Sequence, residues 1–232
     1  MESSKACSLN PICTHPFLKH GINDNLEAQL TTLYHHYFDN PDNYVEGIVE
    51  DLGNVVGGAT PSTERKDFFC DSGIVWLSPR DLTATGLKFI YRGETYITEA
   101  AYKSCSTKMM PAGTVLLTSR APVGTVAIAM TELCTNQGFK SIIPNDDVGS
   151  AFVYYFLKEN RQLLENHSSG TTFMEISGNV LRKMPATIPK SSMAKLFSAQ
   201  CKPLFDYQRR NELEIAKLQE LRQTMVSSIS SH

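Results

Sequence analysis

The sequence predicts an α+β fold: a globular domain with a twisted, mostly antiparallel sheet, flanked by a short N-terminal helix and a long C-terminal helix. Two patterns indicate it. The middle of the chain alternates short β-like runs with turn residues, and both flanking regions repeat apolar residues at three- and four-residue steps. Sheet and helices therefore belong to separate stretches of sequence, as in α+β proteins.

The N-terminal helix is predicted within residues 22–43. Ile22, Leu26, Leu30, Leu33 and Tyr37 fall on one helical face, which ends before Asn40-Pro41. Residues 1–21 are poorly patterned, and we expect them to form a leader.

Residues 44–190 are predicted to form the globular domain. Within this domain, a helix is expected at FVYYFLKENRQLLENH. Trp76 and the apolar residues of GTVLLT and GTVAIA should lie in the core. Six runs predict strands: IVEDLGNVV, IVWLS, KFIYRGETYIT, GTVLLTSR, GTVAIAM and FKSIIP.

The long helix is predicted over residues 191–232, with Ser191 or Ser192 as its cap. From Pro203 to Ile229 it would extend roughly 40 Å. An approximate heptad stripe follows Leu204, Tyr207, Asn211, Leu218, Leu221 and Met225. Glu214 falls on a core position beside Ile215, so Asn211 fits either a register-setting polar residue or a ragged apolar face. Helices with such faces pair with each other or with a partner chain.

The composition excludes several classes of protein. A net charge of -2 gives no global attraction to nucleic acid, so a DNA-binding protein of this composition needs local positive charge. The six cysteines form no CxxC pair and have no histidine at metal-ligand spacing, so we expect free thiols and no metal. Without a signal-peptide core or an apolar run of ~20 residues, the chain is expected to be cytoplasmic.

No set of residues predicts catalysis. His35 and His36 are adjacent on a helix and point in different directions. Ser119 and Ser169 lie outside any GxSxG elbow, and Cys134 has no identifiable histidine base. We therefore expect a protein that is not an enzyme.

The stretch VGGATPS, Val56 to Ser62, raises the question of a phosphate site. Pro61 lacks an amide proton and disfavours a helix directly after the glycines, so a P-loop is not predicted. The glycines can turn the chain and bring backbone close to its neighbours, or Thr60 and Ser62 can contact phosphate.

Polar residues in the predicted loops suggest DNA contact. Arginine pairs with guanine, asparagine and glutamine pair with adenine, and hydroxyl groups contact phosphate. The same residue types are also ordinary in turns, which remains the alternative for each position. The candidates are Arg80, Arg120, Asn136, Gln137, Lys140, Thr171 and Thr172.

Taken in order, six motifs resemble the target recognition domain of type I restriction-modification specificity subunits. They are GxxxGGxTPS, W(L)SPRDL, the ITxxA motif of Tyr96 to Ala101, PAGTVLLTSRAPVGTVAIA, TNQGFKSIIP and SGTTFMEIS. The resemblance extends into the flanking helices, where INDNLEAQLTTLYHHYF and QRRNELEIAKLQELRQTMVSS are similar to the family's conserved spacer helix.

The resemblance implies a non-catalytic subunit that reads double-stranded DNA for its partners. Modification subunits would methylate adenine with S-adenosylmethionine, and restriction subunits would translocate and cut DNA. This chain would bind no cofactor, while S-adenosylmethionine, ATP and Mg would lie on the partners. The partners would also supply much of the phosphate neutralisation that a chain of net charge -2 lacks.

A complete family member carries two recognition domains, whereas this sequence carries one, so the resemblance implies a half-length subunit. Homodimerisation through the helices would restore two domains and make the two recognised half-sites identical and inverted. The dimer helices would present Leu26, Leu30, Leu33, Leu204, Tyr207, Asn211, Leu218, Leu221 and Met225. Two alternatives stay open: a detached recognition module of a fused restriction-methyltransferase, and an unassembled recombination-donor gene product.

Overall fold

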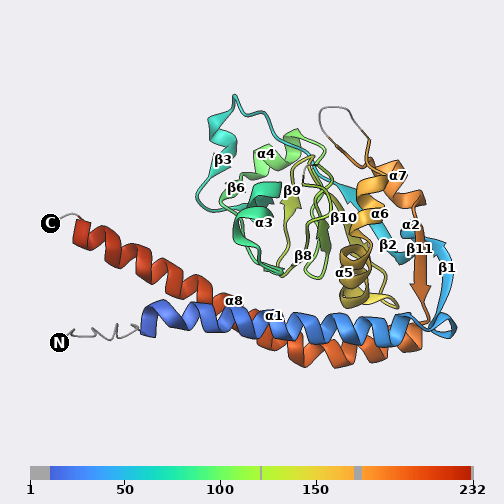
Figure 1. Cartoon of the computed structure of the whole chain (residues 1–232). Coiled ribbons are helices and arrows are strands. Elements are labelled where there is room, and N and C mark those ends of the chain that lie inside the picture. Colours follow the sequence, from blue (N-terminus) through green and yellow to red (C-terminus); the bar gives the residue numbers. More distant parts are fainter. Residues whose placement is uncertain (1–10, 121, 170–173, 231–232) are drawn as a thin grey trace, which may run out of the picture. The chain divides into compact units, whose positions relative to one another are not determined.

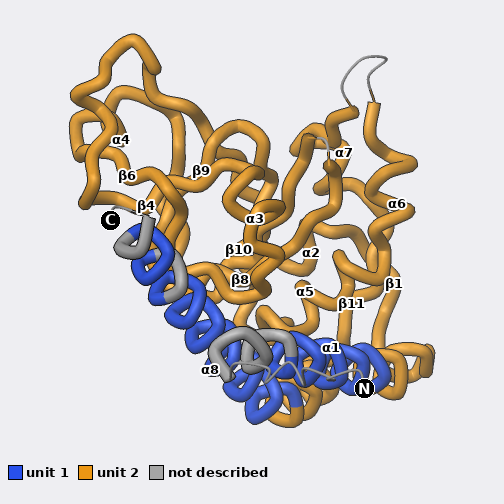
Figure 2. Tube along the Cα trace, turned by 60° about the vertical axis from the view of Figure 1, so that its left-hand side comes forward, with its two compact units in different colours: residues 1–32, 201–232 blue, residues 33–200 orange. Residues whose placement is uncertain are grey.

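A computed structural model describes residues 11–120, 122–169 and 174–230 of the chain (Figure 1). The chain forms two compact units, coloured separately in Figure 2. We call residues 1–32 and 201–232 the helical unit, and residues 33–200 the sheet unit.

Eight α-helices lie in the described residues, and two of them are long. The helices are α1 Pro11–Phe38, α2 Val49–Leu52, α3 Pro79–Thr85, α4 Glu99–Ser104, α5 Gly149–Glu159, α6 Arg161–Asn166, α7 Gly178–Lys183 and α8 Ser191–Ser230. Short 3-10 turns occur at Pro41–Asn43 and Lys66–Phe68. The long C-terminal helix is confirmed, and it continues through Pro203.

The sheet unit contains three small sheets, with strand orders β2-β10-β7-β8-β5, β3-β6-β4-β9 and β1-β11. Among the described strands, β4–β9 and β5–β8 pair in parallel and the other pairs are antiparallel. The prediction of an α+β domain with a mostly antiparallel sheet is therefore confirmed. The strands are β1 Tyr44–Ile48, β2 Gly53–Gly57, β3 Phe69–Cys70, β4 Ile74–Leu77, β5 Phe89–Ile90, β6 Thr95–Ile97, β7 Val115–Leu117, β8 Val126–Ala129, β9 Cys134–Thr135, β10 Lys140–Pro144 and β11 Pro185–Pro189.

The two-stranded sheet joins the beginning and the end of the domain. Its register places Tyr44 opposite Pro189 and Ile48 opposite Pro185. Segments far apart in the sequence thus lie side by side, and the chain enters and leaves the sheets at one place.

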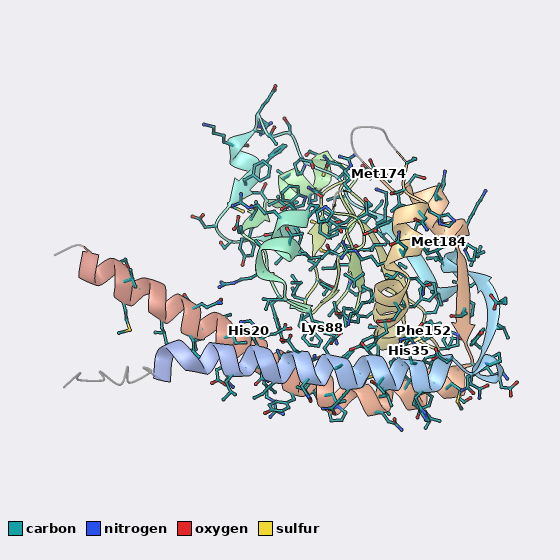
Figure 3. All side chains as sticks on the ribbon, viewed as in Figure 1. His20, His35, Lys88, Phe152, Met174 and Met184 are labelled. Carbon is teal, nitrogen blue, oxygen red and sulfur yellow. The ribbon has the colours of Figure 1, made fainter. Side chains whose placement is uncertain are left out.

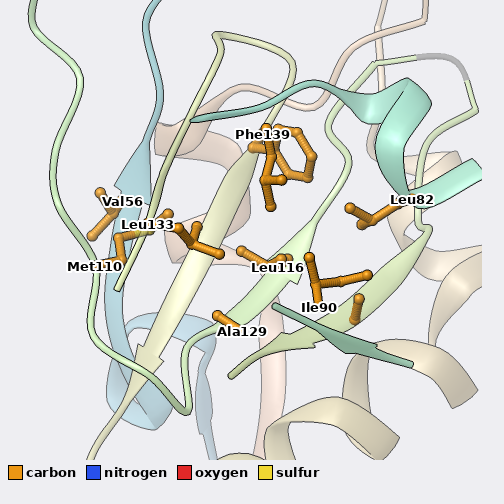
Figure 4. Close-up of a cluster of buried hydrophobic side chains, with 10 residues drawn as sticks. Val56, Leu82, Ile90, Met110, Leu116, Ala129, Leu133 and Phe139 are labelled. Atoms are coloured by element: carbon orange, nitrogen blue, oxygen red, sulfur yellow. The ribbon is translucent and has the colours of Figure 1, made fainter. Parts of the chain in front are cut away.

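Two apolar clusters form the core of the sheet unit. The larger one lies between the five-stranded sheet and α3 (Figure 4), and the smaller one contains Trp76, as predicted. The larger cluster comprises Val56, Leu77, Leu82, Ile90, Met110, Leu116, Ala127, Ala129, Leu133 and Phe139. The smaller comprises Phe68, Trp76, Ile97, Ala101 and Cys134.

An aromatic cluster connects the helices of the sheet unit. The rings of Phe38 and Phe152 meet edge to face, with centroids 4.7 Å apart and planes at 82°. Phe197, from the first turns of α8, contacts Phe38, Tyr34 and Tyr155. Such pairs prefer tilted geometries, and here they fix the end of α1 against α5 and the start of α8.

Within the helical unit, α1 and α8 pair antiparallel through a polar network. Asn211 Nδ2 donates to Asn23 Oδ1 at 2.9 Å, and Lys19 Nζ donates to Asn211 Oδ1 at 3.3 Å. Gln208 Nε2 donates to Glu27 Oε2 at 3.0 Å and to the Asn23 carbonyl at 3.2 Å. Because a shift of one turn would leave these buried groups without partners, the network favours one register.

The buried face of α8 differs from the predicted stripe. Gln208, Asn211 and Ile215 are buried, whereas Tyr207 and Leu221 are 43% and 51% exposed. The predicted stripe was drawn through apolar residues, so it included Tyr207 and left out the polar Gln208. Gln208 can nevertheless be buried, because its side chain forms hydrogen bonds there. Ile215, and not Glu214, takes the core position. The predicted stripe is therefore one residue out of phase with the buried face at Tyr207. Leu221 and Met225, at 51% and 52% exposed, lie outside that face, and their expected contact with a partner chain stays a prediction.

Two further predictions were wrong in detail. Helix α1 begins at Pro11, well before the predicted start at Ile22. The sequence did not indicate this earlier start, because Pro16 and Gly21 have low helix propensity. The run IVEDLGNVV is not one strand, because α2 interrupts it and the Asp51 carboxylate accepts the Ile48 amide at 2.9 Å.

We expect a pH-dependent contribution of His35 to stability. The Asp39 carboxylate, 3.0 Å from Nδ1, and Glu159, 3.1 Å from Nε2, raise the pKa of His35 above its ordinary value. A raised pKa in the folded state means that the stabilisation is fully present below about pH 6.5 and is lost as pH rises through the folded pKa. His35→Gln should therefore lower the melting temperature more at pH 5.5 than at pH 9.

The control is His36→Gln, which removes the neighbouring exposed histidine. Unfolding is followed by the fluorescence of Trp76, the chain's one tryptophan. An equal effect of His35→Gln at both pH values would contradict the assignment.

Candidate nucleic-acid interface

The end of β2 and the turn after β9 approach each other at a glycine. The Ala59 amide donates to the Thr135 carbonyl at 2.9 Å. A Cβ added to Gly58 would lie 2.1 Å from the carbonyl oxygen of Asn136 and 2.2 Å from that of Thr135. Gly58 therefore permits a backbone contact that no other residue allows without displacement, which is one of the two roles expected for VGGATPS.

The same place joins the two larger sheets. The segment between β9 and β10 passes from the four-stranded sheet to the five-stranded one. The Asn136 amide donates to the Leu77 carbonyl at 2.8 Å, and Trp76 Nε1 donates to the Ala59 carbonyl at 3.1 Å. The loop after β2, the end of β4 and the turn after β9 are thereby held together.

Predicted DNA-contact residues meet at this junction. Thr60 Oγ1 donates a hydrogen bond to Gln137 Oε1, and the Gln137 side chain is exposed. Asn136 Oδ1 accepts the Gly138 amide at 2.8 Å, so this oxygen shapes the turn.

Two predicted cations share one carboxylate beside the turn. Arg120 Nε donates to Glu175 Oε2 at 2.9 Å, and Lys140 Nζ lies 3.7 Å from Glu175 Oε1. The Arg120 side chain is 46% exposed and that of Lys140 only 16%. We call Arg120, Lys140 and Glu175 the charged triad.

Burial and charge act in opposite directions on Lys140. Burial lowers the pKa of this lysine, and the neighbouring Arg120 lowers it further, whereas Glu175 raises it. The carboxylate therefore offsets the cost of keeping two positive charges together.

The remaining candidates lie outside these contacts. Arg80 is exposed in the first turn of α3; the adjacent Pro79 is the closest neighbour of Gly138, with its Cγ 2.7 Å from an added Cβ. Ser62 is exposed after the buried Pro61. Thr171 and Thr172 lie outside the described residues.

Sequence reasoning missed two residues at this site. Glu175 was not among the candidates, and only its place in FMEIS could have drawn attention to it. Arg182 in α7 donates to the Val55 carbonyl at 3.0 Å and to Asn179 Oδ1 at 3.2 Å. A cation near the end of a short helix carries no sequence signal of its own.

The Cys134 thiol lies buried in the smaller apolar cluster. Burial raises the pKa of the Cys134 thiol to about 12, so it stays protonated and unreactive at neutral pH. Within residues 11–120, 122–169 and 174–230, no three metal-ligating side chains gather closely enough to hold an ion. Over the same residues, no helix combines the length and apolar character needed to cross a membrane.

Comparison with known proteins decides the family. The pattern of the type I restriction modification DNA specificity domain matches residues 41–223. The chain belongs to this family. The specificity domain thus includes the sheet unit from Pro41 onward and continues into α8.

Two curated relatives of this specificity domain are named as specificity subunits. The type I restriction enzyme MjaIX specificity subunit of Methanocaldococcus jannaschii is 46% identical over 143 residues, 61% of this chain and 33% of that protein. The EcoR124I/EcoR124II specificity subunit of Escherichia coli is 30% identical over 133 residues, 53% of this chain and 32% of that protein. The chain spans about a third of these relatives.

A solved structure shares the fold. The S subunit of a type I restriction-modification system from M. genitalium aligns with a TM-score of 0.62 at 12% identity. The alignment covers 92% of this chain and 54% of that one.

The close approach at Gly58 gives a stability prediction. Gly58→Ala should lower the free energy of unfolding by about 2 kcal/mol, because the new methyl group displaces the backbone of the Asn136 turn. Gly57→Ala is the matched control, since its added Cβ meets nothing nearer than Lys140 Cδ at 3.8 Å. Urea unfolding followed by Trp76 fluorescence measures both, and equal stability of the two variants would contradict the role of Gly58.

Proposed function

We propose that this chain recognises a DNA sequence as the specificity subunit of a type I restriction-modification complex, and that the junction of loops described above contacts the duplex. The observation that carries the proposal is the gathering of Arg120, Lys140, Gln137 and Thr60 at one junction of a specificity domain. Lysine, arginine and hydroxyl groups bind phosphate, and arginine and glutamine also pair with base edges.

The partners in this proposal perform the chemistry. Modification subunits methylate adenine with S-adenosylmethionine, and restriction subunits, using ATP and Mg, cut the DNA in the cytoplasm. The chain itself contributes recognition, which agrees with a buried, unreactive Cys134 thiol. The names of the MjaIX and EcoR124I/EcoR124II relatives support a place in such a complex.

The proposal includes a homodimer held by the helices. Leu26, Leu30 and Asn211 are buried within one chain, and Asn211 bonds across the α1–α8 pair of that chain. The exposed apolar side chains of α8, including Leu213 at 48% and Leu221 at 51%, support a contact with a second copy or a modification subunit. Leu33, Leu204, Tyr207, Leu218 and Met225 complete the proposed helix surface.

The first test is adenine methylation across the source genome, with and without this gene. Deletion should remove methylation from a bipartite motif with two inverted, identical halves, because a two-fold symmetric dimer presents the same surface to each half-site. Loss of an asymmetric motif would replace the homodimer with a pair of different recognition halves. No change in methylation of a strain that expresses the gene would contradict the proposed function.

The second test measures binding of the full chain to duplex DNA carrying that motif. Gln137→Ala should weaken binding about fivefold or more, since a base-edge contact contributes about 1–3 kcal/mol, and Arg120→Ala should weaken binding through the loss of a phosphate contact. Arg161→Ala is the matched control, because Arg161 Nε also pairs with a glutamate, Glu165, at 2.9 Å on α6. Unchanged affinity of the Arg120 and Gln137 variants would exclude these side chains from the interface.

A further inference from the structure

Backbone hydrogen bonds to two neighbouring segments fix the position of Glu175, whose carboxylate lies between two cations. Its amide donates to the Ser169 carbonyl and its carbonyl accepts the Ser169 amide, both at 3.0 Å. The amide of the next residue, the buried Ile176, donates to the Ser119 carbonyl at 3.0 Å. Glu175 therefore stands on a fixed frame, with the exposed Met174 before it (Figure 3).

The geometry of the charged triad suits an anionic ligand. One oxygen of Glu175 accepts Arg120 Nε at 2.9 Å and the other faces Lys140 Nζ at 3.7 Å. Two anionic oxygens shared by a guanidinium and an ammonium group are also what a DNA phosphate presents. The partial exposure of Arg120 and Glu175, 46% and 34%, leaves the triad accessible to a duplex.

We propose that Glu175 stands in for a DNA phosphate in the free chain and so restrains binding to duplexes that lack the target sequence. This inference rests on the proposed function. A DNA phosphate must displace the Glu175 carboxylate before it can bind Arg120 and Lys140. Replacing the carboxylate by phosphate is unfavourable unless contacts to the bases form at the same time. Phosphate contacts dominate binding to DNA of any sequence, so Glu175 lowers that background and widens the preference for the target.

A purely structural ion pair is the competing explanation. Partly exposed pairs stabilise folded proteins little. Loss of the Glu175 charge should accordingly leave the fold intact while changing the response to DNA, which makes the two explanations separable.

The experiment compares Glu175→Gln with a matched control in the full chain. Asp206→Asn makes the same change in net charge, and Asp206 also lies between a lysine and an arginine, 3.0 Å from Lys202 Nζ and 3.1 Å from an Arg209 terminal nitrogen. Asp206 and both its partners belong to the helical unit. The probe is a labelled duplex of random sequence, and fluorescence anisotropy is recorded over a salt series.

Glu175→Gln should bind the random duplex about fivefold more tightly, with a plot of log affinity against log salt steeper by about one, as expected for one further phosphate contact. Asp206→Asn should match the wild type. Adding Arg120→Gln to Glu175→Gln should abolish the gain. Melting temperatures check the fold, and Glu175→Ala, with the same expected gain, serves as a second variant.

The outcomes separate the two proposals. If the wild-type chain binds DNA and Glu175→Gln binds no more tightly, or Asp206→Asn gains equally, the role of Glu175 is overturned while the proposed function stands. If no variant binds any duplex, including one carrying the methylated motif, at the lowest salt, the proposed function fails and this inference fails with it.

Discussion

The site depends on one backbone contact, the approach of Gly58 to the carbonyls of Thr135 and Asn136. It places the loop after β2 against the turn that carries the chain from the four-stranded to the five-stranded sheet. The hydrogen bond from Ala59 to Thr135 accompanies that approach, and the one from Asn136 to Leu77 continues the parallel pairing of β4 with β9. Because the loop after β2, the end of β4 and the turn after β9 converge there, small sheets that share no strand act as one support for polar side chains.

The positive charge at this junction comes from the local placement of a few side chains and not from the overall composition of the chain. A chain with a net charge of -2 places two cations side by side and sets one carboxylate between them. The desolvation of Lys140 is tolerable because Glu175 favours its charged form. Two cations with one carboxylate leave one net positive charge beside the turn, in a chain whose net charge is negative.

The sequence predicted the fold class, the long helix and most of the strands, because their periodicity is a local property. It also predicted many of the residues that meet at the junction, since these lie in loops with a recognisable family order. The sequence did not predict which face of α8 is buried, because Gln208 is buried with hydrogen-bond partners on α1 that are remote in sequence. Glu175 was missed for a similar reason: its partners Arg120 and Lys140 are remote along the chain, and their contact depends on the pairing of Arg120 with Glu175 in an isolated bridge.

The pairing of β1 with β11 also bears on the order in which the molecule folds. The helical unit is built from segments separated by the ~170 residues of the sheet unit, and closing so long a loop costs more chain entropy than closing a short one. Once Tyr44 and Pro189 are paired, the effective separation falls to roughly 20 residues, and the closure cost of the α1–α8 contact falls by about 2 kcal/mol. Chain entropy therefore favours folding of the sheets first and docking of the two helices afterwards.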